Sequence, residues 1–161
     1  MPETIKALSL WQPWASLCCI GHPDDPARSV KGFETRSWGT RYRGPLLIHA
    51  AQRFTYAERG ACFSPLINGA LRRHYHVAGV FSPDDLPRGA IVGRVELVEC
   101  HPAMAAASEA DEHALAMGHY EPGRFAWEIV RPVLFPEPIA FRGRQGLFNV
   151  PLTALPEEAR P

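Results

Sequence analysis

The chain has 161 residues, the size of one ordinary domain, and 46% of them are hydrophobic, which is enough to fill a single core. Seventeen basic residues balance seventeen acidic ones, so the protein as a whole exerts no strong electrostatic attraction on a long nucleic-acid duplex or an anionic membrane. The four cysteines lack C-x-x-C spacing, and the sequence has neither a signal-peptide pattern at its start nor the ~20 consecutive apolar residues of a membrane span. We therefore predict one reduced, cytoplasmic domain over residues 1–161, without membrane contact.

Charge is nevertheless unevenly distributed along the chain. Residues 28–43 carry five cations against one acid, whereas residues 95–123 carry six acids and neither lysine nor arginine. These two blocks predict a basic side and a separate acidic side of the molecule.

The first quarter of the chain predicts a strand, a helix and a loop. Residues 6–11 alternate weakly between apolar and polar side chains, which is typical of a strand. Pro13 suits the first turn of a helix, where its missing N–H costs nothing, and Gly21 suits the helix end. Residues 22–29 contain two prolines and two aspartates and predict a loop.

Residues 31–50 concentrate ionisable and aromatic side chains where a plain core strand would carry valine and isoleucine. Glu34, Arg36 and Trp38 alternate, so a strand places a carboxylate, a guanidinium and an indole on one face. A short basic turn leads to a second, apolar strand that ends near His49. We predict that this stretch contains the functional centre.

The middle of the chain predicts two short helices and a strand. Helical spacing in residues 52–76 is interrupted by glycine and proline, which favours two short helices over one long helix. A turn-rich connection at 82–89 leads to residues 90–100, where apolar and polar side chains alternate clearly.

The last third predicts a helix and two strands. Residues 103–117 suit a helix that Gly118 ends, and strands are expected at 124–134 and 146–150, joined by a segment rich in proline and glycine. Strict alternation of strand and helix is absent, so the pattern favours an α+β fold over a doubly wound sheet. We expect a small mixed β-barrel of five to six strands with helical insertions.

The residue types around the charged stretch suit nucleic-acid recognition. Trp11, Trp14, Trp38 and Tyr42 lie close in sequence to the cations, and single-stranded nucleic acid is commonly held by aromatic faces beside positive charges. The alternatives are ordinary ones: tryptophans that fill the core and charges that form solvated surface pairs. His49 is either a satisfied, partly buried histidine or an acid or base working near pH 7.

No motif calls for a cofactor. The sequence contains no phosphate loop, no G-x-G-x-x-G, no H-E-x-x-H and no G-x-S-x-G. His74 and His76 share a strand-like spacing, but no third ligand stands near them in sequence, so we predict neither a metal nor a cofactor.

Five ordered motifs together resemble the ASCH-domain family. They cover most of the chain, from Lys6 to Pro151. The motifs are Leu8–Ala15, Glu34–Trp38, Gly44–Ala50, Gly89–Gly93, and Phe125–Trp127 with Gly146–Pro151. The resemblance implies a PUA-like β-barrel with a cleft, in proteins proposed to bind RNA or to act on RNA and modified nucleosides.

The family's site residues fall on named positions of this sequence. The resemblance implies that its signature lysine, acid and arginine are Lys31, Glu34 and Arg36, and that the histidine of its I-H-A strand is His49. It also implies that the first turn of the first helix, Gln12 and Trp14, lies at the cleft. One departure is the insertion at 22–29, which changes the cleft entrance.

A second departure bears on the reaction. The smaller ASCH-like acetylcytidine amidohydrolases have a threonine nucleophile three positions after the lysine, and here that position is Glu34. Thr35 is adjacent, but a shift of one residue turns a strand side chain to the opposite face, which disfavours the same mechanism.

The leading prediction is an ASCH domain that binds RNA or a nucleotide, with ribonuclease-type or nucleoside-directed hydrolysis in the charged cleft. The alternatives are a non-catalytic module for single-stranded RNA and an amidohydrolase acting on an acetylated cytidine nucleoside. The predicted catalytic residues are Lys31, Glu34, Arg36 and His49. The predicted ligand-binding residues are Trp11, Gln12, Trp14, Trp38, Tyr42, Arg43 and Trp127.

Overall fold

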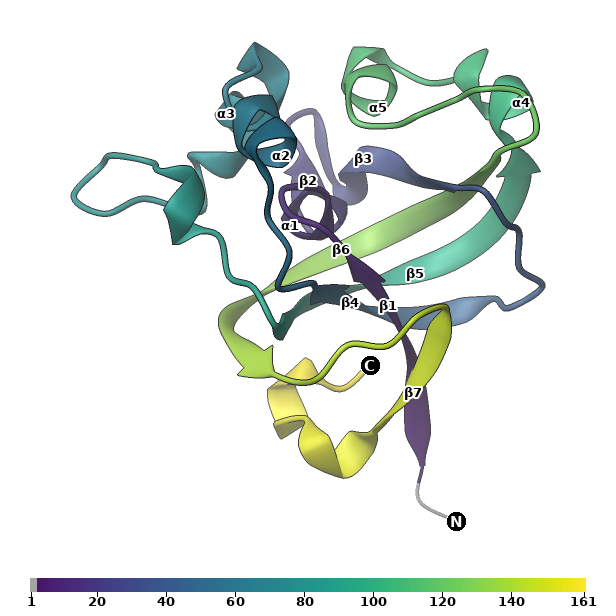
Figure 1. The fold of residues 1–161 in the computed structure, drawn as a ribbon. Coiled ribbons are helices and arrows are strands. Elements are labelled where there is room, and N and C mark those ends of the chain that lie inside the picture. The colour runs from purple at the N-terminus through teal and green to yellow at the C-terminus, as the bar shows by residue number, and fades with distance from the viewer. Residues whose placement is uncertain (1–2) are drawn as a thin grey trace.

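A computed structural model describes residues 3–161, which form a seven-stranded mixed sheet flanked by short helices (Figure 1). The strands are β1 (Thr4–Leu10), β2 (Gly21–His22), β3 (Asp25–Arg36), β4 (Gly44–Ala50), β5 (Ala90–Pro102), β6 (Phe125–Ala140) and β7 (Leu147–Pro151). The helices are α1 (Trp14–Cys18), α2 (Tyr56–Ala61), α3 (Pro65–Leu71), α4 (Ala103–Ala107) and α5 (Glu112–Ala116), with 3₁₀ turns at Pro83–Asp85, Leu152–Ala154 and Glu157–Ala159.

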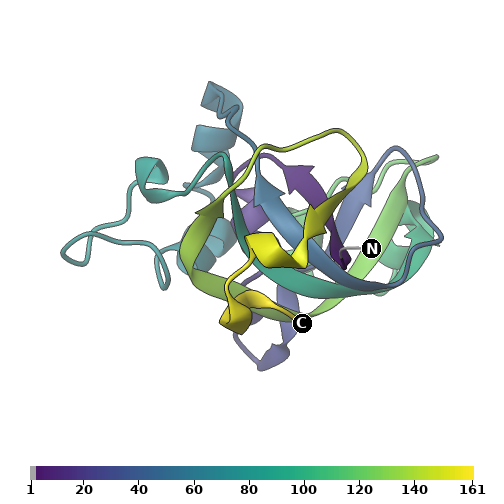
Figure 2. The same cartoon turned by 90° about the horizontal axis from the view of Figure 1, so that it is seen from below.

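The strand order is β2-β3-β6-β5-β4-β1-β7, and only β1 and β4 run parallel. The long β5–β6 hairpin shifts register at three points, and such bulges increase local twist. The C-terminal turns lie below the sheet in Figure 1 and in front of it in Figure 2, which is viewed from below. The α+β class is confirmed. Because β2 and β7 are the end strands of the described sheet, a closed barrel stays a prediction.

Two hydrophobic clusters lie on opposite faces of the central strands. Leu8 and Ile48 belong to one cluster, whereas Ala7 and Leu47, their neighbours in β1 and β4, belong to the other. This is the alternation that the strand period requires. Both central strands are therefore buried on two sides and form a rigid base for the side chains at their ends.

The predicted loop at 22–29 is wrong. Gly21 pairs with Ser29 and His22 with Asp25, so β2 and the start of β3 form a hairpin at the sheet edge. Pro26 of β3 lies at the register shift of this hairpin, and a strand tolerates proline at such a bulge. This added edge strand also explains why the sheet has seven strands and not five or six.

The predicted helix over 103–117 is two separate single-turn helices, α4 and α5. Asp111 causes the break because its Oδ1 accepts a hydrogen bond from the N–H of Ala114, 2.8 Å away, and so begins a new helix. The two short helices expected within 52–76 are confirmed as α2 and α3.

None of the helices in residues 3–161 is long and apolar enough to cross a bilayer.

The two charge blocks are not on separate sides of the molecule. Arg28 binds Asp111 at 3.0 Å, and Arg43 binds Glu99. The folded sheet brings the basic segment against the acidic one, so part of its positive charge is neutralised. The expectation of separate basic and acidic sides is therefore wrong, because charge blocks in the sequence do not show how the fold pairs them.

Candidate functional site: a two-lobed cleft

Two adjoining cavities share Ser9, Trp11, Arg36 and Trp38 in their walls. We call them the Glu34 lobe, which also contains Lys31, Trp14 and Arg124, and the His49 lobe, which also contains Gln52, Arg142, Gly143 and Arg144. Their volumes are about 760 Å³ and about 960 Å³. Each is within the range of small-molecule sites in proteins.

A buried ion network forms one wall of the Glu34 lobe. The Nζ of Lys31 lies 3.1 Å from Oε2 of Glu34, and Nη1 of Arg36 lies 3.3 Å from Oε1. Lys31 also donates to the carbonyl of Phe33, 2.9 Å away. Lys31 and Glu34 are buried, and mutual pairing is what makes buried charges tolerable.

A local backbone irregularity brings Lys31 to Glu34. Side chains three positions apart in a regular strand point to opposite faces. Here the β3–β6 register shifts between Arg28 and Phe33, and Gly32 adopts φ +75°. A bulge with glycine in the left-handed region turns the chain so that both side chains reach one side.

Arg36 stands at the junction of the two lobes. Its Nη1 binds Glu34, and its Cζ lies 5.4 Å from the centre of the Trp38 ring. Its Nε is buried and has no hydrogen-bond partner among the described residues. A buried donor without an acceptor costs free energy, and a ligand oxygen that reached this N–H would remove that cost.

The His49 lobe contains a hydrogen-bonded serine and histidine. Nε2 of His49 lies 2.7 Å from the carbonyl oxygen of Phe141, and Nδ1 lies 2.9 Å from Oγ of Ser9. A carbonyl only accepts, so Nε2 carries the proton and Nδ1 accepts from the Ser9 hydroxyl. Burial lowers the pKa of His49 more than the Phe141 hydrogen bond raises it, which favours the neutral ring.

All the charged side chains that line the His49 lobe are positive. Arg36, Arg142 and Arg144 line it without any aspartate or glutamate. Arg142 and Arg144 are exposed and take part in none of the ion pairs of residues 3–161. Trp11, 41% exposed, forms part of the rim, with Cζ of Arg53 lying 4.6 Å from its ring centre.

The structure thus brings seven of the predicted site residues to the cleft. They are Trp11, Trp14, Lys31, Glu34, Arg36, Trp38 and His49. Glu34, Arg36 and Trp38 line the same lobe, as their alternation predicts. The other four predicted residues line neither lobe.

Gln12 and Trp127 are buried supports of the cleft. Gln12 accepts from the N–H of Ser16 and donates to the carbonyl of Pro87, 2.8 Å away, so it ties α1 to a distant turn. Trp127 is fully buried, and its Nε1–H donates to the carbonyl of Trp38 at 3.1 Å. Both therefore hold the cleft in place and do not face it.

Tyr42 and Arg43 also make internal contacts. The Tyr42 hydroxyl donates to the carbonyl of Pro45, and Arg43 binds Glu99. The cleft residues that sequence reasoning missed include Ser9, Arg124, Arg142 and Arg144. Nothing in the sequence around Ser9 indicates that it belongs to the cleft. It lies there because the parallel pairing of β1 and β4 places it beside His49.

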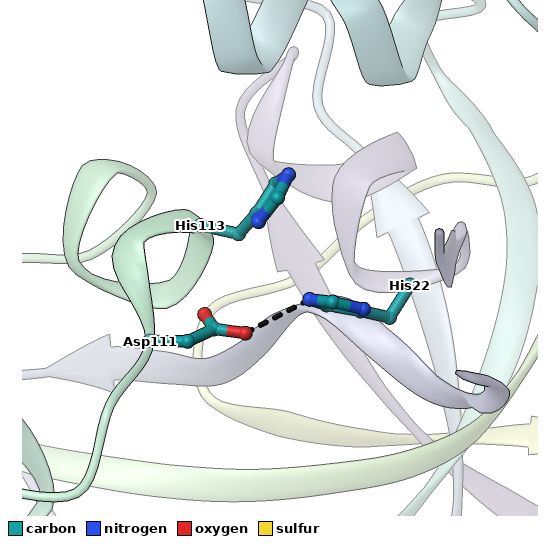
Figure 3. Close-up of side chains that lie close together, drawn as sticks. All are labelled: His22, Asp111 and His113. Carbon is teal, nitrogen blue, oxygen red and sulfur yellow. Dashed lines mark hydrogen bonds and ion pairs between the residues drawn. The ribbon is translucent and has the colours of Figure 1, made fainter. Parts of the chain in front are cut away.

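His22, Asp111 and His113 form a second cluster away from the cleft, with possible ligand atoms all within 4.8 Å of one another (Figure 3). Nδ1 of His22 accepts from the N–H of Asp24 at 3.1 Å, so its Nε2 carries the proton and donates to Asp111 at 2.8 Å. A protonated nitrogen offers no lone pair to a metal ion. Arg28 occupies the same carboxylate oxygen, so the cluster fits an ion-paired helix cap better than a metal site.

Comparison with known proteins shows the family of this chain. The model of the ASCH domain matches residues 8–138, and the chain belongs to the ASCH-domain family, as the five motifs predict. This family is linked to RNA binding.

Two relatives carry the name Activating signal cointegrator 1. The Mus musculus protein is 35% identical and the Homo sapiens protein 34% identical, each over 96 residues that make up 58% of this chain. The matched segment is 14% of either relative, so this chain spans only a small part of their length.

Proposed function

We propose that residues 1–161 act as a single ASCH domain that binds single-stranded RNA, or a nucleotide, in the two-lobed cleft. The observation that carries the proposal is Arg36, which lines both lobes at their junction and whose buried Nε–H has no acceptor within the described chain. A phosphate at that junction would satisfy the donor.

Electrostatics favour an anion in the His49 lobe. Its charged lining residues are three arginines, and the exposed Arg142 and Arg144 are available to phosphate oxygens. Arginine suits phosphate because its planar fork donates two parallel hydrogen bonds. The overall charge of the protein is zero, so a short single strand suits it better than a long duplex.

The aromatic residues supply stacking surfaces. Trp11 and the guanidinium of Arg53 lie against each other at the rim, and planar groups of both kinds stack on bases. Trp38 is held edge-on against Trp127, with ring centres 4.8 Å apart. A platform fixed in this way loses little side-chain entropy when a base binds.

The two lobes favour two neighbouring nucleotides. Each lobe has the volume of a small-molecule site, and Arg36 belongs to both. A base in each lobe with the connecting phosphate at Arg36 would use both lobes and the arginine that they share.

The geometry supports binding better than cleavage centred on Glu34. Both carboxylate oxygens of Glu34 are already engaged by Lys31 and Arg36, whereas a general base needs a free oxygen near the proton that it removes. Thr35, the nearby hydroxyl, accepts a hydrogen bond from the N–H of His119 at 2.9 Å. Neither ribonuclease chemistry at Glu34 nor deacetylation at Thr35 is favoured.

Fluorescence anisotropy with a labelled eight-nucleotide RNA tests the proposal. Arg36→Gln and Arg142→Gln should each weaken binding roughly tenfold, the effect of losing one charge-assisted hydrogen bond. Each should also reduce the salt dependence of binding. For single strands, the slope of log K against log salt concentration is about −0.7 for each phosphate contact, so losing one contact makes the slope shallower.

Arg73→Gln is the matched control, because Arg73 is exposed on the last turn after α3 and lines neither lobe. It should bind RNA as the wild type does. Equal affinities for wild type, Arg36→Gln and Arg142→Gln would show that RNA does not use this cleft.

A further inference from the structure

We propose that Ser9 and His49 form a nucleophile and base that hydrolyse carboxylic esters of anionic ligands bound in the His49 lobe. This goes beyond RNA binding and does not depend on it. Two neighbouring parallel strands create the pair, since Ser9 of β1 and His49 of β4 are direct register partners.

The hydrogen bonds have the directions that an activated serine needs. The Ser9 hydroxyl donates to Nδ1 of His49 at 2.9 Å, and Nε2–H of His49 donates to the Phe141 carbonyl at 2.7 Å. A nucleophile, a base and a third group that orients the base are the recurring parts of such sites. Here a backbone carbonyl is the third group.

The surroundings keep the histidine ready to accept a proton. The side chains packed against it are uncharged: Ser9 from β1 and Phe148 from β7, whose ring centre lies 6.1 Å away. The charged residues of the same lobe are Arg36, Arg142 and Arg144, and none of them is an acid that would favour the protonated ring. Burial lowers the pKa of His49 and so favours the neutral ring.

Gly143 leaves the space that the pair occupies. A Cβ at this position would come within 2.5 Å of Cε1 of His49 and 3.1 Å of Oγ of Ser9. Ser9 is half-buried and lines both lobes, so its oxygen is reachable from the cleft. Arg36 lines both lobes as well, so its positive charge can stabilise a developing oxyanion.

The reaction balances with the groups present and one water. Oγ of Ser9 attacks the acyl carbon, its proton passes to Nδ1 of His49, and the carbonyl electron pair moves to oxygen. The intermediate collapses, the ester C–O bond breaks, and the leaving alcohol takes the proton from Nδ1. Water then attacks acyl-Ser9, gives its proton to Nδ1, and Ser9 recovers that proton as the acid departs.

The orienting group limits the substrate. A neutral carbonyl stabilises the imidazolium less than a carboxylate would, so the pair suits esters, whose alcohols leave readily, and not amides. The cationic lobe selects esters that carry phosphate.

A fluorophosphonate probe tests this pair in the full chain. Oγ of an activated serine displaces fluoride from phosphorus, and peptide mapping locates the adduct. Native wild type should be labelled at Ser9 about a hundredfold faster than at Ser37, a size typical of general-base assistance. Ser37 lines the Glu34 lobe and has no side-chain hydrogen bond to a histidine within residues 3–161, so it is an internal control.

The pH dependence separates catalysis from a structural hydrogen bond. The rate of Ser9 labelling should increase with pH as His49 loses its proton, with a midpoint below the usual histidine pKa of about 6.5. The rate should no longer change with pH at neutral pH and above. This measurement uses wild type and needs no substitution in the Ser9–His49 pair. If Ser9 is labelled no faster than Ser37, or if its labelling rate does not change with pH, the Ser9–His49 hydrogen bond is only structural and the proposal is wrong. Ser9→Ala should lose the adduct. RNA binding by wild type is measured without the probe and Ser9 labelling without RNA, so each proposal can fail while the other stands.

Discussion

Lys31 and Glu34 face each other across 3.1 Å although they are three residues apart in one strand. Gly32, between them, makes this possible through its left-handed backbone at φ +75°. The buried ion pair of the Glu34 lobe therefore depends on the backbone conformation of one glycine.

Gly32→Ala should destabilise the protein by about 1–2 kcal/mol, the cost of holding a residue with a Cβ in the left-handed region. The nearest side-chain atom to that Cβ would be Cβ of Ala114 at 3.6 Å, an ordinary contact, so the cost comes from the backbone. Urea unfolding measures it. Gly60→Ala in α2 meets nothing within 4 Å and should be neutral or stabilising; an equal loss there would contradict the backbone explanation.

The charged pair itself should behave as a coupled unit. Glu34→Gln leaves Lys31 buried without its carboxylate and should cost about 3 kcal/mol or more. Lys31→Met should cost less, about 1–3 kcal/mol, because Arg36 still pairs with Glu34. The double variant should lose less than the sum of the two, since it leaves neither charge alone. Strictly additive losses in a double-mutant cycle would show that the pair is not coupled.

The sequence predicts those parts of the site that depend on local spacing. Alternation places Glu34, Arg36 and Trp38 on one face, and the structure puts all three in one lobe. The sequence does not predict Lys31 beside Glu34 from geometry, because the bulge at Gly32 reverses the side on which Lys31 points.

Features that depend on distant pairing escaped prediction. Ser9 meets His49 only because β1 and β4 run parallel in one register. Arg142 and Arg144 lie in a connection between strands, and nothing local shows that it folds over the cleft. Trp127 is chemically suited to stacking, yet tertiary packing buries it entirely.

Asp111 should contribute to stability in a pH-dependent manner. Burial raises the pKa of its carboxyl, but hydrogen bonds from Ala114 and His22 outweigh this and hold the pKa below its usual value. The folded state therefore favours the ionised form. Its contribution is present above the unfolded pKa of about 3.9 and is lost as the pH falls through the lower folded value.

Asp111→Asn keeps a good helix cap and removes only the charge. It should lower stability at pH 7 by about 1 kcal/mol or less, because the side chain is partly exposed, and the difference should close below about pH 4. Urea unfolding at pH 7, 5 and 3 checks this, with the exposed Glu109→Gln as control.

A second measurement tests whether the cluster is an ion-paired cap or a metal site. If Zn²⁺ raises the melting temperature of wild type but not that of Asp111→Asn, the cluster is a metal site and the ion-paired cap is wrong.

Gly143→Ala should disrupt the Ser9–His49 pair without touching either residue. The added Cβ would lie 2.5 Å from Cε1 and 2.8 Å from Nδ1 of His49, so the ring must move. Overpacking of this kind costs about 1–3 kcal/mol, and the displaced ring should no longer accept from Ser9. Fluorophosphonate labelling of Ser9 should fall to the rate at Ser37, while urea unfolding still shows a cooperative fold. Gly69→Ala, whose Cβ would meet nothing within 4 Å, should label as wild type does. If Gly143→Ala folds and labels Ser9 at the wild-type rate, His49 is not the base that activates Ser9.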